Sequence, residues 1–337
     1  MLFRNLLHKK CSEKSISFGF VYCVFLLLWY NLLGVIIMIT IFQQVGTLMF
    51  FALIGFLLGK TKLLNDTHTK ALSVLCVYFF VPCSVFKTFS LNFTVEYVRT
   101  NYVLLLDSIC ILTIVVLLSE LVAHFMTRIR YEQKVFSYSL TIPNYGYMGY
   151  ALAAAFMGNA GLMDVMIFCL PMSLYVYIFG FSSLTNSKLS FKKVLNPVFI
   201  TTVVGIIWGL CEIPVPQIFL NIATQGAGCM GPVSMLLLGL TLSDIRLKEM
   251  VSDVHIYEVS FLRLIVIPIL LWFALNAVFD RHIATVATFV YAMPCGLNTV
   301  VYPKLIGENC KAGTSLAFIS NVLSCVTIPL ILLLVGI

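Results

Sequence analysis

Two short segments of the chain combine proline, glycine and polar residues inside long apolar stretches. Residues 141–149 read Thr-Ile-Pro-Asn-Tyr-Gly-Tyr-Met-Gly, and residues 293–299 read Met-Pro-Cys-Gly-Leu-Asn-Thr. Proline removes a backbone hydrogen bond and disfavours helix in the residue before it, and the following glycines, Gly146 and Gly296, allow the chain to unwind. We therefore predict that a membrane-spanning helix is broken at each segment. Such naked backbone is tolerated in a membrane only where it is buried in protein or lines a wet cavity.

A pair of broken helices favours an anionic ligand. Behind each proline a new half-helix begins, and its free N–H groups and positive dipole end, roughly half a unit charge, attract an anion. The neutral donors and acceptors at the breaks suit a carboxylate. The predicted substrate-binding residues are Asn144, Tyr145, Gly146, Cys295, Gly296, Asn298 and Thr299, with Pro143 and Pro294 as the crossover prolines. The alternative is that both prolines are ordinary kinks, but two breaks at equivalent places favour a binding site near the middle of the membrane.

Three charged residues lie within apolar stretches, where charge is costly and often functional. Asp107 lies about six residues inside its predicted span, roughly 9 Å from the outer end by helix rise. We interpret it either as a group that carries a proton or binds a coupling cation, or as a shallow carboxylate that reaches interfacial water. Glu120 and Arg263 are predicted nearer the cytoplasmic ends of their spans, with their charged heads extended toward water.

Other kinds of chemistry find no suitable residues in the sequence. The 5 histidines are dispersed, and most of the 11 cysteines lie in apolar stretches without a CxxC pair, so we predict neither a metal site nor a disulfide framework. No Walker loop, HExxH or GxSxG motif occurs. We therefore predict no enzyme activity and no cofactor.

The composition identifies the class of protein to which these segments belong. Of 337 residues, 61% are apolar and 10% charged, and the mean hydropathy is +1.02. A soluble chain is roughly 45–50% apolar and about 25% charged, so this is a membrane protein. At about 20 residues a span, the chain has room for roughly ten helices and no separate catalytic domain. The net charge of +7 comes from Lys and Arg scattered through the loops, which excludes a nucleic-acid-binding patch.

Hydrophobic runs predict ten spans in an all-α polytopic fold. They are placed at residues 38–59, 71–88, 102–125, 136–157, 163–183, 195–213, 218–241, 258–279, 283–303 and 312–335. The connections after the odd-numbered spans hold 13 Lys and Arg residues, whereas the remaining connections hold 3. Because basic loops stay in the cytoplasm, we predict a multi-pass plasma-membrane protein with its carboxyl terminus outside.

Residues 1–37 fall outside this plan. Basic residues precede an apolar run at 18–29, which could be an eleventh helix or a signal-like segment. The alternative is that the natural protein starts at Met38 and that the extension is an artefact of gene calling.

A set of glycines and prolines recurs with nearly the same spacing in the two halves of the chain. In the first half, Gly55, Gly59, Pro82 and Pro143 are separated by 4, 23 and 61 residues; in the second, Gly205, Gly209, Pro232 and Pro294 are separated by 4, 23 and 62. This spacing predicts two five-helix units, residues 38–185 and 194–337, joined by a cytoplasmic linker at 186–193. Because five is odd, the second unit must be inverted relative to the first, with helices four and nine as the broken, crossing helices. The two GxxxG motifs are interpreted as sites of close helix packing, and the spans that contain Pro82 and Pro232 should flank the site.

The segments at 142–149 and 292–301 are similar to the two crossovers of the auxin efflux carrier family, and those at 231–242 and 326–330 also look typical of it. The resemblance covers about residues 38–337. The family includes plant auxin carriers and bacterial transporters of malonate or malate. It implies ten helices in two inverted repeats, a scaffold bundle and a transport bundle, and movement of organic anions by alternating access. It also makes Asn144 the best candidate for contact with a substrate carboxylate. The long central loop of the plant carriers is absent, and Tyr145 and Tyr147 depart from the plant pattern, which argues against auxin itself.

These observations predict a secondary transporter for a small organic anion, a mono- or dicarboxylate such as malate or malonate. Its expected partners are this substrate, the lipid bilayer and, in a homodimer, a second copy of the chain. One alternative is a sodium- or proton-coupled symporter of the bile-acid type, in which Asp107 is essential. The other is a channel or a non-transporting sensor with the same architecture.

Overall fold

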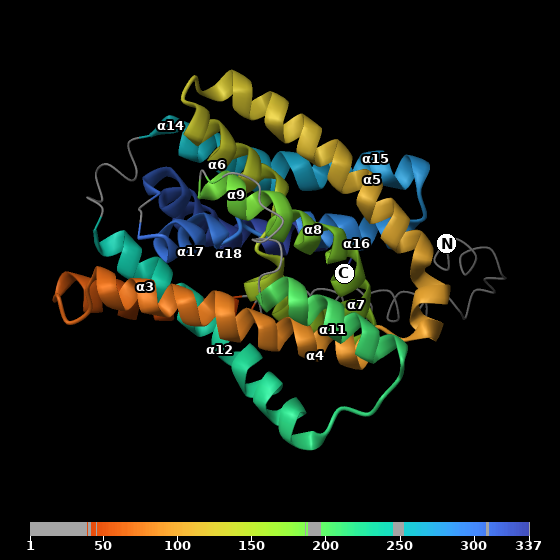
Figure 1. Cartoon of the computed structure of the whole chain (residues 1–337). Helices are drawn as coiled ribbons and strands as arrows, with labels where there is room; N and C mark the ends of the chain where they lie inside the picture. The colour runs from red at the N-terminus through yellow and green to blue at the C-terminus, as the bar shows by residue number, and fades with distance from the viewer. Residues whose placement is uncertain are drawn as a thin grey trace, which may run out of the picture.

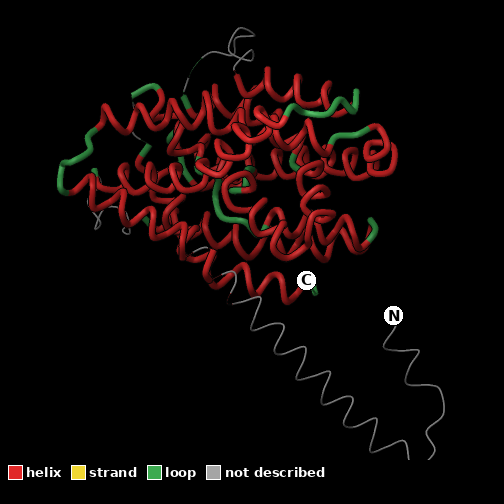
Figure 2. The backbone as a smooth tube through the Cα atoms, turned by 90° about the horizontal axis from the view of Figure 1, so that it is seen from below, coloured by secondary structure: helices red, strands yellow, loops and turns green. Residues whose placement is uncertain are grey.

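The computed structural model describes residues 39, 42–44, 46–185, 187, 197–244, 253–307 and 310–336, and in this part of the chain the elements are helices, without strands. Figure 2 shows the helices filling nearly all of the described backbone. The predictions for residues 1–37, and nearly all of the linker at 186–193, lie outside the described residues.

Seven helices of the described residues are long and apolar enough to cross a membrane. They are Phe42–Lys60, Asp66–Asn92, Val95–Met126, Ala160–Leu184, Gln217–Ser243, Val254–Val278 and Lys311–Val335. A shorter apolar helix, α11, runs from Pro197 to Leu210. The long helices correspond to seven of the predicted spans, with ends that differ by a few residues. The largest difference is at α5 (Val95–Met126), which begins seven residues before the predicted start. These first turns end at a kink at Asn101 and are capped by the Thr94 side chain, which accepts from the Tyr97 N–H.

Several of these helices contain π-helical turns. Asp66–Asn92 consists of α3 (Asp66–Leu75), η1 (Cys76–Phe80) and α4 (Val81–Asn92). Val254–Val278 consists of α14 (Val254–Phe261), η4 (Leu262–Val266) and α15 (Ile267–Val278). Both turns lie just before a proline, Pro82 or Pro268, whose ring would clash with a carbonyl of a regular preceding turn. The remaining long helices are α12 (Gln217–Ser243) and α18 (Lys311–Val335).

The segments predicted as spans four and nine are interrupted. The first runs through α6 (Arg130–Thr141), η2 (Tyr145–Gly149) and the part of α7 (Tyr150–Phe168) that precedes a kink at Gly158, and the second consists of α16 (Arg281–Tyr291) and α17 (Asn298–Leu305). The part of α7 behind the kink opens the next span, Ala160–Leu184. Helix α7 is followed by α8 (Leu170–Tyr175), η3 (Val176–Gly180) and α9 (Phe181–Leu184). Figure 1 shows α3, α4, α11 and α12 along one side of the molecule, α5, α14 and α15 along the opposite side, and α16, α17 and α18 between them.

The glycines of the first GxxxG motif lie against α12. A Cβ atom at Gly55 would overlap the backbone of Leu236, and one at Gly59 would overlap the side chain of Ser243. The second motif packs on α4 in the same way, since Cβ atoms at Gly205 and Gly209 would press on Phe89. The interpretation of both motifs as close-packing sites is therefore confirmed. The packing is reciprocal: the helix that opens the first half lies on the second half, and α11 lies on the first.

Replacing Gly209 with Ala is expected to lower the free energy of unfolding by about 1–3 kcal/mol, the usual range for overpacking a tight contact. The new Cβ would lie 2.8 Å from the carbonyl oxygen of Phe93, which is backbone and cannot rotate away. Gly228→Ala is the matched control, because no atom lies within 4 Å of a Cβ there and α12 should gain helix propensity. Thermal unfolding in detergent would measure both. Equal melting temperatures for the two variants would show that the contact is not tight.

Candidate functional site

The two interrupted helices meet at their breaks. Pro143 and Cys295 form an isolated antiparallel bridge. The Asn144 N–H donates to the Pro294 carbonyl at 2.8 Å, and the Gly296 N–H donates to the Ile142 carbonyl at 3.1 Å. Each break therefore supplies the hydrogen bonds that the other has lost, which is how backbone can leave a helix inside a membrane protein.

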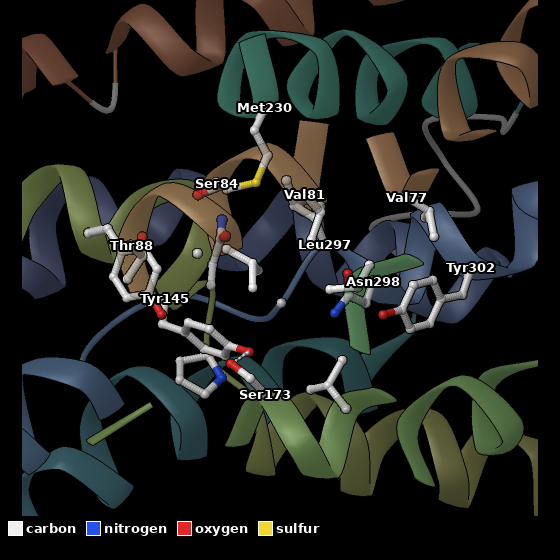
Figure 3. Close-up of a pocket in the computed structure, with 18 of the residues that line it drawn as sticks. Val77, Val81, Ser84, Thr88, Tyr145, Ser173, Met230, Leu297, Asn298 and Tyr302 are labelled. Atoms are coloured by element: carbon white, nitrogen blue, oxygen red, sulfur yellow. Dashed lines mark hydrogen bonds between the residues drawn. The ribbon is translucent and has the colours of Figure 1, made fainter. Parts of the chain in front are cut away.

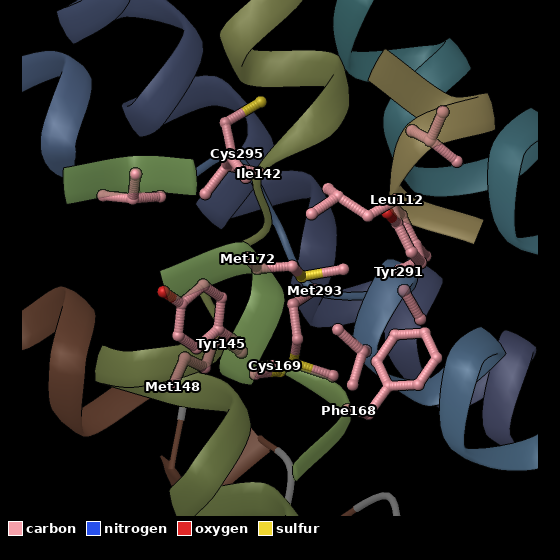
Figure 4. Close-up of a cluster of buried hydrophobic side chains, with 14 of the residues drawn as sticks. Leu112, Ile142, Tyr145, Met148, Phe168, Cys169, Met172, Tyr291, Met293 and Cys295 are labelled. Atoms are coloured by element: carbon pink, nitrogen blue, oxygen red, sulfur yellow. The ribbon is translucent and has the colours of Figure 1, made fainter. Parts of the chain in front are cut away.

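Glycine permits this close approach. A Cβ atom at Gly296 would lie 3.2 Å from the carbonyl oxygen of Ile142 and 3.4 Å from that of Pro143. Below the crossing, Ile142, Met293 and Cys295 belong to a buried apolar cluster with side chains from α5, α7 and α8 (Figure 4). The crossing is thus held on one side by dry packing, which leaves its other side for a ligand.

Two helix N-termini begin at the crossing without a capping side chain. The π-helix η2 starts directly after Asn144, and α17 starts directly after Leu297, and neither residue makes a side-chain cap hydrogen bond. The first N–H groups of a helix have no partner within the helix. Together with the positive dipole ends, these groups favour a negatively charged ligand.

A cavity lies between the crossing and the helices α4 and α12. Its volume is about 70 Å³, whereas one ordered water needs only about 10–15 Å³. Figure 3 shows side chains from both breaks and from the neighbouring helices directed toward it. The lining includes Val77, Val81, Ser84, Val85 and Thr88 from the Pro82 helix, Met230 from the Pro232 helix, and Pro143, Asn144, Tyr145, Gly146, Gly296, Leu297 and Asn298 from the two breaks. The helices with Pro82 and Pro232 therefore flank it, as the sequence predicts.

Asn144 is the unusual residue of this cavity. Its side chain is 1% exposed, and neither its amide oxygen nor its amide nitrogen has a hydrogen-bond partner among the described residues. Burying an unpaired amide costs about 1–3 kcal/mol, so such a group calls for a functional explanation. A ligand with both donor and acceptor capacity, or a carboxylate that takes the N–H₂ group, would supply one.

Asn298, Tyr145 and Ser173, three other polar residues of the cavity, are already paired. The Asn298 Nδ2 donates to the Tyr138 hydroxyl at 2.8 Å, which joins α17 to α6. The hydroxyls of Tyr145 and Ser173 face each other at 3.0 Å, as Figure 3 shows. These pairs fix the walls of the cavity and leave Asn144 as the amide available to a ligand.

The structure brings most of the predicted site residues together, but not all. Asn144, Tyr145, Gly146, Gly296 and Asn298 line the cavity with Pro143. Cys295, Thr299 and Pro294 do not line it. Cys295 is fully buried, with its N–H donating to the Ser320 hydroxyl, and the Thr299 hydroxyl donates to the Gly296 and Gly313 carbonyls. Asp107 also lies outside the lining of the cavity, on α5.

The prediction for Arg263 was wrong. Its side chain is fully buried rather than extended toward water, because Asp253 caps a helix that starts at Val254 and Arg263 therefore lies near the middle of Val254–Val278. Its Nη1 donates to the Leu140 carbonyl at 2.8 Å, and its Nε donates to the Met293 carbonyl at 3.2 Å. Both carbonyls lie just before a helix break, where the usual acceptance from the next turn of the helix is interrupted. They are therefore available to a buried guanidinium.

A second cavity, a groove of about 830 Å³, continues from the first. The two share Ser84, Thr88, Gly146, Tyr150 and Met230. The groove extends along α4 to Asn92, the last residue of that helix. Lys87 is the charged residue of its lining, and a cation at the mouth of a route to the crossing suits an anion.

At the other end of the Asp66–Asn92 helix, ion pairs link α17 to α3 and to the end of α12. Lys304, at the end of α17, is 4% exposed, and its Nζ lies 2.8 Å from an oxygen of Asp66 and 3.3 Å from an oxygen of Asp244. Asp66 begins α3 and Asp244 follows α12. In the sequence, Lys304 is only one of the 13 Lys and Arg residues in the connections after the odd-numbered spans. Nothing local shows that two carboxylates from distant helices converge on it.

Comparison with known proteins agrees with this geometry. The family model for the membrane transport proteins matches residues 40–187 and residues 181–332, which together cover most of the chain. The chain belongs to the auxin efflux carrier family. A relative within curated proteins, an uncharacterized transporter of Methanothermobacter thermautotrophicus, is 24% identical over 298 residues, which cover 86% of this chain and 96% of the relative. As an auxin efflux carrier family member, the chain is a multi-pass membrane transporter and does not belong to an enzyme family.

Proposed function

We propose that this member of the auxin efflux carrier family is a secondary transporter of a small organic anion, a mono- or dicarboxylate such as malonate or malate. One observation carries the proposal: the buried, unpaired amide of Asn144 lies in a cavity where two uncapped helix N-termini begin. The N–H₂ group of Asn144 would donate to a substrate carboxylate. The cavity suits a ligand of a few heavy atoms, since its volume is about 70 Å³.

The ten-helix inverted repeat is part of this proposal. The units 38–185 and 194–337 would be related by a two-fold axis in the membrane plane that passes through the crossing. The antiparallel bridge of Pro143 with Cys295 and the reciprocal packing of the GxxxG helices support it. We place the protein in the plasma membrane with its carboxyl terminus outside, on the basis of the Lys and Arg bias.

The two ends of the Asp66–Asn92 helix support a mechanism of alternating access. The groove reaches the crossing from the Asn92 end, whereas the ion pairs of Lys304 close the Asp66 end. Given the predicted orientation, this arrangement is open to the outside and closed to the cytoplasm. In the opposite state the Lys304 pairs would separate and the groove would close.

Uptake of radiolabelled malonate into proteoliposomes tests the proposal. We expect saturable uptake. Unlabelled malate should compete with it strongly, and malonamide, the neutral diamide, only weakly. Flux that rises linearly with concentration would indicate a channel. Absence of binding and flux for every C2 to C5 mono- and dicarboxylate would overturn the proposed substrate class.

Asp107 separates this proposal from an ion-coupled symporter. Because Asp107 does not line the cavity, we expect Asp107→Asn to change the dissociation constant of malonate less than about twofold, a difference well below the free energy of one hydrogen bond. Calorimetric titration of the purified variant would measure it. Abolished transport together with a lost dependence on sodium or pH would instead favour the coupling role.

A further inference from the structure

We propose that Arg263 is the residue that makes the crossing electropositive and thereby selects anions over neutral ligands. The inference rests on the proposed function and adds the source of its charge selectivity. It concerns a positioning and specificity residue, because Arg263 does not line the cavity itself. Its guanidinium is bound to Leu140, three residues before Pro143, and to Met293, the residue before Pro294.

A count of charges at the crossing gives the first argument. Two helices begin there, η2 and α17, and each contributes at most about half a positive charge. Two helices also end there, α6 and α16, and each contributes about half a negative charge. The four ends therefore nearly cancel in net charge, so the two N-termini attract an anion locally but leave the crossing as a whole close to neutral. Arg263 adds one full positive charge and shifts the sum to about +1.

The position of the guanidinium gives the second argument. It donates to one carbonyl near the end of α6 and to another just after α16, so it pairs with the negative ends and leaves the positive ends free to act on the cavity. A planar guanidinium with several N–H groups can hold two carbonyls at once, which a lysine ammonium does less well.

Among the described residues, no carboxylate pairs with Arg263. Its partners are two carbonyls and the ring of Tyr291, whose centroid lies 5.1 Å from the guanidinium carbon. Its Nη2 is buried without a hydrogen-bond partner, and the ion pairs of the described residues involve other groups. A fully buried cation paired only with dipoles is costly for stability, which indicates that its field is used.

Binding of three isosteric probes would test this role. Malonate, malonamate and malonamide carry two, one and no negative charges at neutral pH. If Arg263 acts through its charge, Arg263→Gln should lower the affinity for malonate more than the affinity for malonamate and leave the affinity for malonamide unchanged. The expected loss is on the order of tenfold for each negative charge of the ligand, for a charge separation of roughly 10 Å. Arg263→Lys should retain the order of affinities, malonate above malonamate above malonamide. Arg99→Gln, which removes an exposed charge near the start of α5, serves as the control. A uniform loss across the three probes, or a lysine variant that behaves like the glutamine variant, would overturn the inference. The lysine variant decides the question even where the glutamine variant does not fold.

A thiol introduced by Asn144→Cys tests the same field without any ligand. A positive potential favours the thiolate, so Arg263→Gln in this background should slow alkylation of the introduced thiol at a given pH several-fold, as measured peptide by peptide with mass spectrometry. An unchanged rate in a folded variant would contradict the role of Arg263. If no carboxylate binds the unaltered protein but the thiol still responds, the substrate proposal fails and the inference about Arg263 stands.

Discussion

Replacing Asn144 with Ala should strongly weaken malonate binding while leaving the ligand-free protein at least as stable as before. The variant loses a donor to a charged ligand, a contact of about 1.5–3 kcal/mol, which corresponds to roughly a 10- to 100-fold weaker affinity. It also removes an amide that is buried without a partner among the described residues, so folding loses no hydrogen bond. Calorimetric binding and thermal unfolding, measured on the same purified sample, would give both quantities. The variant Asn144→Asp, which introduces a negative charge, should abolish binding altogether, since it places a carboxylate against the ligand.

Asn321 provides the matched control for Asn144. It is equally buried, at 1% exposure, but its Nδ2 donates to the Ala317 carbonyl at 2.6 Å within α18, and it does not line the cavity. Asn321→Ala should therefore lower the melting temperature and leave malonate affinity unchanged, the reverse of the Asn144 result. If Asn144→Ala transported malonate at the normal rate, the site would have to lie elsewhere.

The positions of the helix breaks could be predicted from the sequence because their causes are local. A proline without an N–H and a glycine without a Cβ act on their own turn of the chain, so Pro143, Gly146, Pro294 and Gly296 mark the interruptions before any tertiary contact is known. The repeated spacing then predicted that the breaks belong together, and the bridge between Pro143 and Cys295 shows that they do.

Which polar side chain is available for a ligand could not be predicted in the same way. Asn144 and Thr299 are both polar residues within a few positions of a crossover proline, yet the Thr299 hydroxyl is taken by the Gly313 carbonyl of α18, whereas the Asn144 amide has no partner among the described residues. Arg263 was assigned to the wrong environment for a related reason. Its partner carbonyl at Leu140 lies 123 residues away in sequence, and only the fold places the two together.

Removing the two carboxylates that hold Lys304 should destabilise the closed end of the transporter more than removing Lys304 itself. Asp66 and Asp244 have side chains that are 77% and 45% exposed, so Lys304→Met leaves two carboxylates that water can solvate. The double variant Asp66→Asn with Asp244→Asn instead leaves a cation that is 4% exposed without a counter-ion. The expected cost is on the order of 2–3 kcal/mol, below that of a fully buried pair because the carboxylates are partly solvated.

Hydrogen exchange would show where this cost appears. Lys304 lies on α17, while its partners lie at the ends of α3 and α12. If these pairs close one side of the transporter, the double variant should exchange faster at α3 and α17 and populate the opposite state, with Arg99→Gln unchanged as an exposed-charge control. In the unaltered protein these pairs break only when α17 separates from α3 and α12. Malonate supplied from the side of the groove should favour the state in which the pairs are formed, and should therefore slow exchange at α3 and α17. Faster exchange in Lys304→Met than in the double variant would mean that unpaired carboxylates cost more free energy at this place than an unpaired lysine. In that case the closure would have to come from apolar packing between α17 and α12.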